Sequence, residues 1–361
     1  MLQTVMLYKR DNKMIRMELG KNSYNIEIER GNLAKAGTLL NLNRKVLVLT
    51  DEGVPRVYAE TIAAQCRNGY IKVVPQGEGS KTLQRAEEIL TEMLRCQFSR
   101  KDCVVAVGGG VIGDLGGFVA SLYMRGIDFY NVPTTVLSQV DSSIGGKTAV
   151  NLAGVKNIIG AFYQPKAVLI DPDTLDTLSK RQIVNGLFEA IKMGATSDKE
   201  LFNLFLSDEL PKYPEETAGG MSCRWKEQLD LIIEKALLVK KQVVEQDEKE
   251  SHLRKILNFG HTIGHGFESA SHGRYLHGEC VALGMLYMSS EDVQDALCEI
   301  YEKLGFEVPP FYTFDLEEVK EAITHDKKAS NQNCSVVFVS EIGNGSIEEW
   351  SMDEVLGRLE C

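Results

Sequence analysis

The stretch Val104-Val105-Ala106-Val107-Gly108-Gly109-Gly110-Val111-Ile112-Gly113-Asp114 decides the fold prediction. The apolar run at 103–107 is typical of a strand that is buried on both faces of a parallel sheet. Three glycines end this run, and we expect a helix to begin at the fourth, Gly113. The spacing Gly108-x-Gly110-x-x-Gly113 matches a dinucleotide-binding pattern, in which backbone N–H groups and a helix N-terminus approach a pyrophosphate. The same pattern also fits a plain strand–helix turn.

Segments on either side of this stretch alternate between strand and helix patterns. We expect strands at 46–50, 70–74, 103–107 and 127–132, and an amphipathic helix over 81–98. Strands separated by helices predict a mainly parallel sheet. After about residue 173 the pattern changes, and helices are expected over 225–244, 253–270 and 279–304, with a loop at 207–220 and a hairpin at 334–349. The predicted fold is an α/β domain at 1–173, in which the glycine pattern favours nucleotide binding, followed by an all-α or mainly helical domain at 174–361, in which the metal-binding candidates described below lie.

Composition excludes several classes of protein. The 361 residues include 40 Lys and Arg but 51 Asp and Glu, a net charge of -11. This balance argues against a general nucleic-acid binder and against an anionic membrane surface as partner. No segment approaches the ~20 apolar residues of a membrane span, and residues 1–18 lack the apolar core of a secretory leader. Eight cysteines without a Cys-x-x-Cys pair favour a reduced, cytoplasmic protein.

A polar segment at 132–148 carries hydroxyls, a carboxylate and a cation close together. Gly146-Lys147-Thr148 is similar to the end of a phosphate-binding loop, but Asp141 occupies the position of that motif's first glycine. A Walker-type NTPase is therefore not supported. Lys147, with Lys156 after the next turn, either binds an anion or lies in solvent.

Histidines gather between residues 261 and 277. His261 and His265 are four apart, a spacing that brings two imidazoles to one zinc ion. Thr262 replaces the Glu of the His-Glu-x-x-His motif, so a zinc protease is not expected. His277 follows at the start of the next predicted helix. Three histidines within seventeen residues favour a metal site over three separate structural roles.

Glu189 and Lys192 lie three residues apart in an otherwise apolar helical segment. Residues at this spacing share a helix face. The pair is either a surface ion pair or, given its apolar neighbours, a buried pair with a function.

Taken together, these motifs resemble the 3-dehydroquinate synthase family of the sugar phosphate cyclase superfamily. The similarity runs in the family's order from about residue 46 to 328, and the strings at 139–147 and 156–162 are its most specific parts. The resemblance implies a phosphate lyase that converts 3-deoxy-D-arabino-heptulosonate 7-phosphate into 3-dehydroquinate and phosphate, in the shikimate pathway of aromatic amino acid biosynthesis. It also implies NAD+ that is used and regenerated, a Zn2+ or Co2+ ion, an active site between the two domains and a cytoplasmic homodimer.

The resemblance assigns roles residue by residue. The metal ligands would be Glu189, His261 and His277, which replaces the His261–His265 pair suggested by spacing. Substrate contact and catalysis would involve Asp141, Lys147, Asn157, Lys192, Lys240, Arg254, Asn258 and His265. The phosphate would be held by Lys147 and Asn157, by Arg125, a candidate to come from the partner subunit, and by Lys327 or Lys328. The expected NAD+ contacts are Asp51, Gln76, Gly77, Glu78, Gly79, Ser80, Lys81, Gly109, Gly110, Val111, Ile112, Gly113, Asp114, Thr134, Thr135, Asp141, Lys147, Lys156, Thr174, Leu175, Asp176 and Thr177.

Three other functions compete with this interpretation. A related cyclase that makes a cyclitol would share fold, NAD+ and metal, but Asn157, Asn258 and His265 favour the dehydroquinate type. A metal-dependent alcohol dehydrogenase would share the domain layout, although a simple alcohol needs no lysine-rich anion site. A non-catalytic anion-binding protein would leave the metal-like residues unexplained.

Overall fold

The computed structural model describes residues 13–210, 212, 221–327 and 333–360. The chain divides into two compact units. Unit 1 comprises the chain up to Thr134 together with Gly146–Thr174, and unit 2 comprises Thr135–Gly145 together with Leu175 onward. The short segment Thr135–Gly145 therefore leaves unit 1 and returns to it, a feature that the sequence interpretation did not include.

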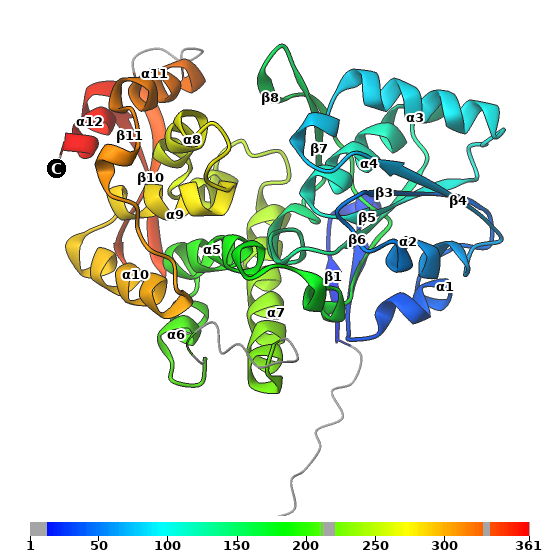
Figure 1. Ribbon diagram of the computed structural model, residues 1–361, viewed down its shortest axis with the longest axis horizontal. Coiled ribbons are helices and arrows are strands. Elements are labelled where there is room, and N and C mark those ends of the chain that lie inside the picture. Colours follow the sequence, from blue (N-terminus) through cyan, green and yellow to red (C-terminus); the bar gives the residue numbers. More distant parts are fainter. Residues whose placement is uncertain (1–12, 211, 213–220, 328–332, 361) are drawn as a thin grey trace, which may run out of the picture. The chain divides into compact units, whose positions relative to one another are not determined.

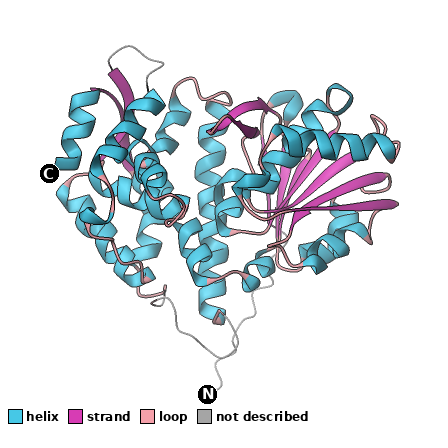
Figure 2. Ribbon diagram, turned by 45° about the horizontal axis from the view of Figure 1, so that its top comes forward, coloured by secondary structure: helices cyan, strands magenta, loops and turns pink. Residues whose placement is uncertain are grey.

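Unit 1 is built on a seven-stranded sheet with the order β1-β2-β9-β6-β5-β3-β4. Figure 2 draws this sheet as magenta strands with helices on both faces. Every neighbouring pair is parallel except β1 with β2, which confirms the mainly parallel sheet. Strands β1, β2 and β9 had not been expected. The strands are β1 (Lys13–Met17), β2 (Tyr24–Ile28), β3 (Lys45–Asp51), β4 (Asn68–Val74), β5 (Cys103–Gly108), β6 (Asp128–Pro133) and β9 (Ala167–Ile170).

Strand β5 is buried on both faces, as its apolar run predicts. Val104 and Ala106 pack in a core with α3 (Leu83–Arg95) and α4 (Gly110–Leu122). Val105 and Val107 point to the opposite core, which contains α1 (Ala36–Leu39) and α2 (Arg56–Ala63) (Figure 1). Because helices cover both faces of the sheet, we expect ligands to bind at the carboxyl ends of the strands.

Helix α4 begins at Gly110 and not at Gly113. The Gly109 carbonyl accepts the N–H groups of Ile112 at 3.1 Å and Gly113 at 3.0 Å, so the first helical turn forms directly after the strand. The later glycines serve helix packing instead. A Cβ at Gly116 would lie 2.9 Å from the Ala106 side chain, too close for any other residue without movement.

A hairpin of β7 (Lys147–Leu152) and β8 (Val155–Phe162) completes unit 1 and had not been predicted. It follows directly on the polar segment, so Lys147 begins a strand. Helix α4 packs against β7, and a Cβ at Gly117 would lie 2.4 Å from the Thr148 side chain.

Unit 2 is mainly helical but is not all-α, because it contains the late hairpin. That hairpin is β10 (Asn333–Glu341) with β11 (Asn344–Ser351). The loop expected at 207–220 lies mostly outside the described residues. The helices are α5 (Lys180–Ser197), α6 (Lys199–Leu206), α7 (Cys223–Gln246), α8 (His261–Ala270), α9 (His277–Tyr287), α10 (Glu291–Leu304), α11 (Leu316–Lys327) and α12 (Met352–Gly357).

Two segments that were each predicted as one continuous helix are interrupted in the structure. The expected helix at 253–270 is a 3-10 turn, Leu253–Asn258, followed by α8, because Gly260 has φ +75 and breaks the helix. The expected helix at 279–304 is divided into α9 and α10. Between them, Met288 O accepts the Val339 N–H at 3.1 Å, and the Ser290 N–H donates to Val339 O at 3.0 Å. Backbone groups that a continuous helix would need are therefore hydrogen-bonded to strand β10.

Among the described residues, no helix combines the length and apolar character that a bilayer crossing requires. The seven described cysteines are free thiols, and Cys103 and Cys280 are buried.

Candidate active site

One carboxylate and two imidazoles converge in unit 2 from three helices. Glu189 lies in the middle of α5, whereas His261 and His277 are the first residues of α8 and α9. Glu189 Oε1 lies 3.5 Å from His277 Nε2 and 4.0 Å from His261 Nε2. One donor atom of each residue can be chosen so that all lie within 4.8 Å of one another. This metal cluster is therefore a geometric candidate for holding one ion.

Glycines allow the three helices to approach closely at this point. A Cβ at Gly278 would lie 2.0 Å from the Asn185 carbonyl oxygen of α5, and one at Gly284 would lie 1.9 Å from the Gly260 carbonyl oxygen. The Gly278 N–H also donates to Asn185 Oδ1 at 2.7 Å. These contacts fix the start of α9 against α5, which sets His277 beside Glu189.

The first turn of α9 is held by a buried carboxylate. Glu279 accepts the Leu276 N–H at 2.8 Å and two guanidinium N–H groups of Arg181, each at 2.6 Å. Such a two-point pairing is geometrically specific. It fixes the backbone that carries His277.

The donor set of the metal cluster fits a divalent cation. Glu189 is 1% exposed, and its Oε1 accepts no hydrogen bond from any residue that the structure describes. Buried carboxylate oxygens normally have partners, so this atom lacks one that a cation would supply. His261 Nδ1 lies 3.1 Å from Phe259 O, which can only accept, so the ring proton is on Nδ1 and the Nε2 lone pair is available. Two imidazoles and one Glu are the ligands of many open catalytic zinc sites.

The electrostatics favour the metal-binding protonation state at Glu189 and His261 but not at His277. Burial, with help from the Lys192 ammonium, lowers the pKa of His261 well below its ordinary value, which keeps that ring neutral. Burial by itself would raise the pKa of Glu189, but Lys192 and the two imidazoles outweigh it and hold that pKa well below its ordinary value. For His277 burial is outweighed by Glu189 and Glu268, which raise its pKa to about 9. A cation would therefore compete with a proton for His277 Nε2.

Unit 2 contains the buried cations Lys192, Lys240 and Arg254, of which Lys192 contacts the metal cluster directly. Lys192 donates to Glu189 Oε2, and Lys240 donates to both the carboxylate and the carbonyl of Asp141. Burial would lower the pKa of Lys192, but Glu189 and Asp141 raise it above its ordinary value. Burial dominates at Lys240 and lowers its pKa to about 8 in spite of Asp141. Arg254 is 2% exposed and donates to Gly145 O at 3.0 Å.

Asp141 reaches this cluster because its segment folds as part of unit 2. It lies on a π-helical turn, Ser138–Ser142, which packs against α5 and α7. A Cβ at Gly186 of α5 would lie 2.3 Å from the Leu137 nitrogen, so this close packing requires glycine. Burial would raise the pKa of Asp141, but Lys240 and Lys192 lower it.

Other expected residues of unit 2 are less closely tied to the cluster. The His265 ring centroid lies 5.4 Å from that of His261, and Asn258 donates to Glu250 Oε1 at 3.1 Å. Thr135 hydrogen-bonds to Ser138 in the polar turn. Leu175, Asp176 and Thr177 lie on a 3-10 turn at the start of unit 2. Lys328 lies outside the described residues, as does the side chain of Lys327.

The residues expected to bind NAD+ in unit 1 gather at one edge of the sheet. Asp51 ends β3, Gln76–Lys81 follow β4, Gly109–Asp114 follow β5, and Thr134 follows β6. Parallel strands end at the same edge, and the strand order reverses between β3 and β5, which is where open α/β sheets bind ligands. Burial raises the pKa of Asp51 although the Gly53 N–H donates to its carboxylate.

Lys81 connects three parts of this edge. Its ammonium is 2.6 Å from Asp114 at the start of α4 and donates to Asn157 of the β7–β8 hairpin. The Asn151 side chain of that hairpin in turn donates to Glu78 at 2.8 Å. The turn after β4, the glycine turn and the hairpin are thus one network.

The side chains expected to bind substrate, its phosphate or NAD+ are divided between the two units. Arg125, Lys147, Lys156 and Asn157 are exposed residues of unit 1, and Arg125 has a left-handed backbone with φ +69. Arg254, Lys192 and Lys240 belong to unit 2. Thr174 ends unit 1 as a buried residue whose hydroxyl donates to Asp171 O at 2.7 Å.

Sequence reasoning missed Glu268, whose Oε2 lies 3.0 Å from His277 Nδ1. A signal was present, because Glu268 follows His261 and His265 at i+7 and i+3, the spacing of one helix face.

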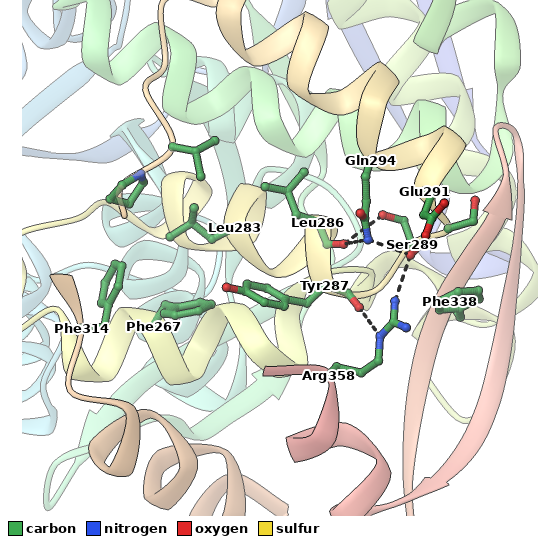
Figure 3. A pocket seen from close by; sticks show the side chains of 13 residues that line it. Phe267, Leu283, Leu286, Tyr287, Ser289, Glu291, Gln294, Phe314, Phe338 and Arg358 are labelled. Carbon is green, nitrogen blue, oxygen red and sulfur yellow. Dashed lines mark hydrogen bonds between the residues drawn. The ribbon is translucent and has the colours of Figure 1, made fainter. Parts of the chain in front are cut away.

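Unit 2 also contains a separate cavity of about 500 Å³. Phe267, Tyr287 and Phe314 line it, and the Arg358 guanidinium beside it donates to the Tyr287 and Ser289 carbonyls (Figure 3). None of the metal-cluster residues lines this cavity, so it is distinct from the candidate site.

Solved structures define the class of fold. A 2-deoxy-scyllo-inosose synthase complexed with carbaglucose-6-phosphate, NAD+ and Co2+ matches with a TM-score of 0.82 at 24% identity, over 96% of this chain and 99% of that chain. A 2-epi-5-epi-valiolone synthase from Streptomyces hygroscopicus subsp. jinggangensis 5008, with NAD+ and Zn2+ bound, matches with a TM-score of 0.81 at 24% identity, over 93% and 96%. The chain has the dehydroquinate synthase-like fold of these sugar phosphate cyclases.

Sequence comparison gives the particular family. A family model for the N-terminal part of 3-dehydroquinate synthase matches residues 71–185, and the model for its C-terminal part matches residues 186–329. A 3-dehydroquinate synthase from Streptococcus pneumoniae (strain ATCC 700669 / Spain 23F-1) is 38% identical over 96% of this chain and 99% of its own length. The chain belongs to the 3-dehydroquinate synthase family.

Proposed function

We propose that the protein is a 3-dehydroquinate synthase of the shikimate pathway, a phosphate lyase that turns 3-deoxy-D-arabino-heptulosonate 7-phosphate into 3-dehydroquinate and phosphate. The observation that carries this proposal is the cluster of the buried Glu189 with the half-buried His261 and His277, in a chain of that family, with Lys192, Lys240 and Arg254 buried in the same unit. Buried cations in a chain of net charge -11 suit a substrate that bears a carboxylate and a phosphate.

The cofactors in this proposal are NAD+ and a Zn2+ or Co2+ ion. NAD+ would accept and return a hydride, and the ion, held by Glu189, His261 and His277, would polarise a substrate hydroxyl. The NAD+ contacts would be the residues at the carboxyl ends of β3 to β6, with Gly109–Asp114 next to the pyrophosphate. The two synthases of this fold were crystallised with NAD+ and with Co2+ or Zn2+, which supports the same pairing here.

The chain's own residues would bind and orient the substrate. Lys192, Lys240 and Arg254 neutralise its anionic groups in a site of low water content, where such pairs are stronger than in water. Asp141 holds Lys240 in place, and Asn258 offers an amide to a substrate hydroxyl. His265, which is more exposed and lies on the same helix as His261, would move a proton. Lys147, Asn157 and Lys328 would hold the phosphate.

We also propose a cytoplasmic homodimer in which Arg125 reaches the partner's phosphate site. Four apolar side chains of the β7–β8 hairpin are about half exposed, Leu152 at 45%, Val155 at 53%, Ile158 at 57% and Phe162 at 47%. Exposed apolar groups concentrated on one hairpin are typical of a protein–protein contact. Sedimentation of the wild type and of Ile158→Lys tests this: the wild type should sediment as a dimer and the variant as a monomer.

The decisive assay combines the protein with catalytic NAD+, Zn2+ and the heptulosonate phosphate. We expect inorganic phosphate and 3-dehydroquinate in equal amounts, without net NADH. Net NADH from a simple alcohol would instead indicate a dehydrogenase, and turnover only with another sugar phosphate would indicate a cyclitol-forming cyclase. Binding of the sugar phosphate without bound metal or turnover would indicate an anion-binding protein.

A further inference from the structure

The two imidazoles of the metal cluster differ in what holds their second nitrogen. His261 Nδ1 faces the Phe259 carbonyl at 3.1 Å, and His277 Nδ1 faces the Glu268 carboxylate at 3.0 Å. Both acceptors belong to α8 or to the turn just before it. In both rings Nε2 faces Glu189 Oε1.

We propose that Glu268 is a positioning residue that fixes the ring orientation and tautomer of His277, so that its Nε2 lone pair faces the ion held by Glu189 and His261. This inference rests on the proposed metal site and adds to it a residue outside the ligand set. A neutral imidazole has one N–H and one lone pair. When Nδ1–H donates to Glu268, only Nε2 can bind the ion.

A second arrangement is possible on distance alone and has to be weighed. One donor atom each of His265, Glu268 and His277 also lie within 4.8 Å of one another, so these three could hold an ion through His277 Nδ1. Burial and hydrogen bonding favour the first arrangement. Glu189 Oε1 is buried with no hydrogen-bond partner among the described residues, whereas the Glu268 side chain is 18% exposed and already pairs with His277.

The fixed proton on His261 supports the same choice. The Phe259 carbonyl forces the His261 lone pair onto Nε2, which is the nitrogen that faces Glu189. The Nε2 lone pair of His261 therefore faces Glu189 before any ion binds. Glu268, by accepting the Nδ1–H of His277, directs the Nε2 lone pair of His277 to the same side. Carboxylates in this outer position are commonly worth 10- to 100-fold in metal affinity.

The test measures Zn2+ affinity and stoichiometry of the metal-free full-length protein by competition with a chromophoric chelator. We expect the wild type to bind one ion per chain, and Glu268→Gln and Glu268→Ala to bind one ion about 10- to 100-fold more weakly. Glu318→Gln is the matched control, because Glu318 pairs with the exposed His272 at 3.1 Å outside the cluster. It should bind Zn2+ as the wild type does.

The spectrum of the Co2+ form distinguishes positioning from direct ligation. If Glu268 only positions His277, the visible absorption bands keep their intensity in Glu268→Gln once the site is saturated. Unchanged affinity in both Glu268 variants would overturn the inference and leave the proposed function standing. So would two ions per wild-type chain with one lost in Glu268→Ala. A wild type that binds no metal would overturn the proposed metal site itself. Far-UV circular dichroism and thermal unfolding of the metal-free variants identify any loss due to misfolding, and Glu268→Gln serves if Glu268→Ala does not fold.

Discussion

The pair formed by Lys240 and Asp141 illustrates how one residue depends on another in this site. Lys240 is 5% exposed, and its ammonium donates hydrogen bonds to the carboxylate and the backbone carbonyl of Asp141. A charge left without its partner in such a place is strongly destabilising, whereas removing both charges is often tolerated. The interaction therefore belongs to the pair and not to either member.

We predict that Lys240→Met lowers the free energy of unfolding of unit 2 by about 3 kcal/mol. The double variant Asp141→Asn with Lys240→Met should recover more than half of that loss, because no charge is left unpaired. Urea unfolding followed by tryptophan fluorescence measures this, since both tryptophans, Trp225 and Trp350, lie in unit 2. Additive losses in the double variant would contradict the prediction.

The turn between α7 and α8 is organised by one carboxylate at the end of α7. Asp247 accepts the backbone N–H groups of Ser251 at 2.8 Å, His252 at 2.7 Å and Arg254 at 3.1 Å. Burial would raise its pKa, but these N–H groups outweigh burial and hold the pKa well below its ordinary value. The turn they form carries Arg254 to the Gly145 carbonyl. The position of Arg254, which we propose to bind substrate, thus depends on the Asp247 carboxylate.

This arrangement predicts a pH-dependent contribution to stability. Because the folded-state pKa of Asp247 lies below the unfolded value of about 4, its contribution is fully present above that value and is lost as pH falls below it. We expect Asp247→Asn to lower the urea midpoint at pH 7 and pH 5, and the difference from wild type to shrink at pH 3.5. Tryptophan fluorescence again reports the midpoint. A difference that stays constant down to pH 3.5 would contradict the assigned interaction.

At the level of the entire chain, the two expected cofactors fall in different units. The metal cluster belongs to unit 2, and the glycine turn with its neighbouring strand ends belongs to unit 1. A ligand that binds only the folded state stabilises the part it binds by mass action. Each cofactor should therefore have its own signature.

We predict that Zn2+ at a hundred times its Kd raises the free energy of unfolding of unit 2 by about 2.7 kcal/mol without NAD+. NAD+ alone should instead slow amide hydrogen exchange in the peptide that spans β5 and α4. Tryptophan fluorescence measures the first effect and exchange mass spectrometry the second. Exchange that is slowed by Zn2+ at the glycine turn, with no change in the tryptophan signal, would contradict this division.

Local patterns were sufficient to predict four of the strands of unit 1 and to indicate a candidate metal site. The run Cys103–Gly108 predicted an interior strand because burial on both faces leaves an entirely apolar sequence, and the glycines after it located the turn. Local patterns also singled out each of Glu189, His261 and His277 as a candidate functional residue. Spacing could pair His261 only with His265, because periodicity relates neighbours on one helix. The choice of Glu189 and His277 came from resemblance to a family.

Helix packing settled what periodicity could not. Glu189, His261 and His277 meet because Gly278 and Gly284 lack a Cβ, so that α9 can approach the backbones of α5 and of the turn before α8 more closely than any other residue would allow. The helix break at Gly260 arises from a left-handed backbone, and the break at Met288–Ser290 arises from hydrogen bonds to β10. Neither feature changes the spacing of apolar residues, so periodicity could not predict it. The segment Thr135–Gly145 reads as a polar loop, yet it packs with unit 2. Sequence patterns record which face of an element is buried, whereas the partner it is buried against depends on contacts between residues far apart in the chain.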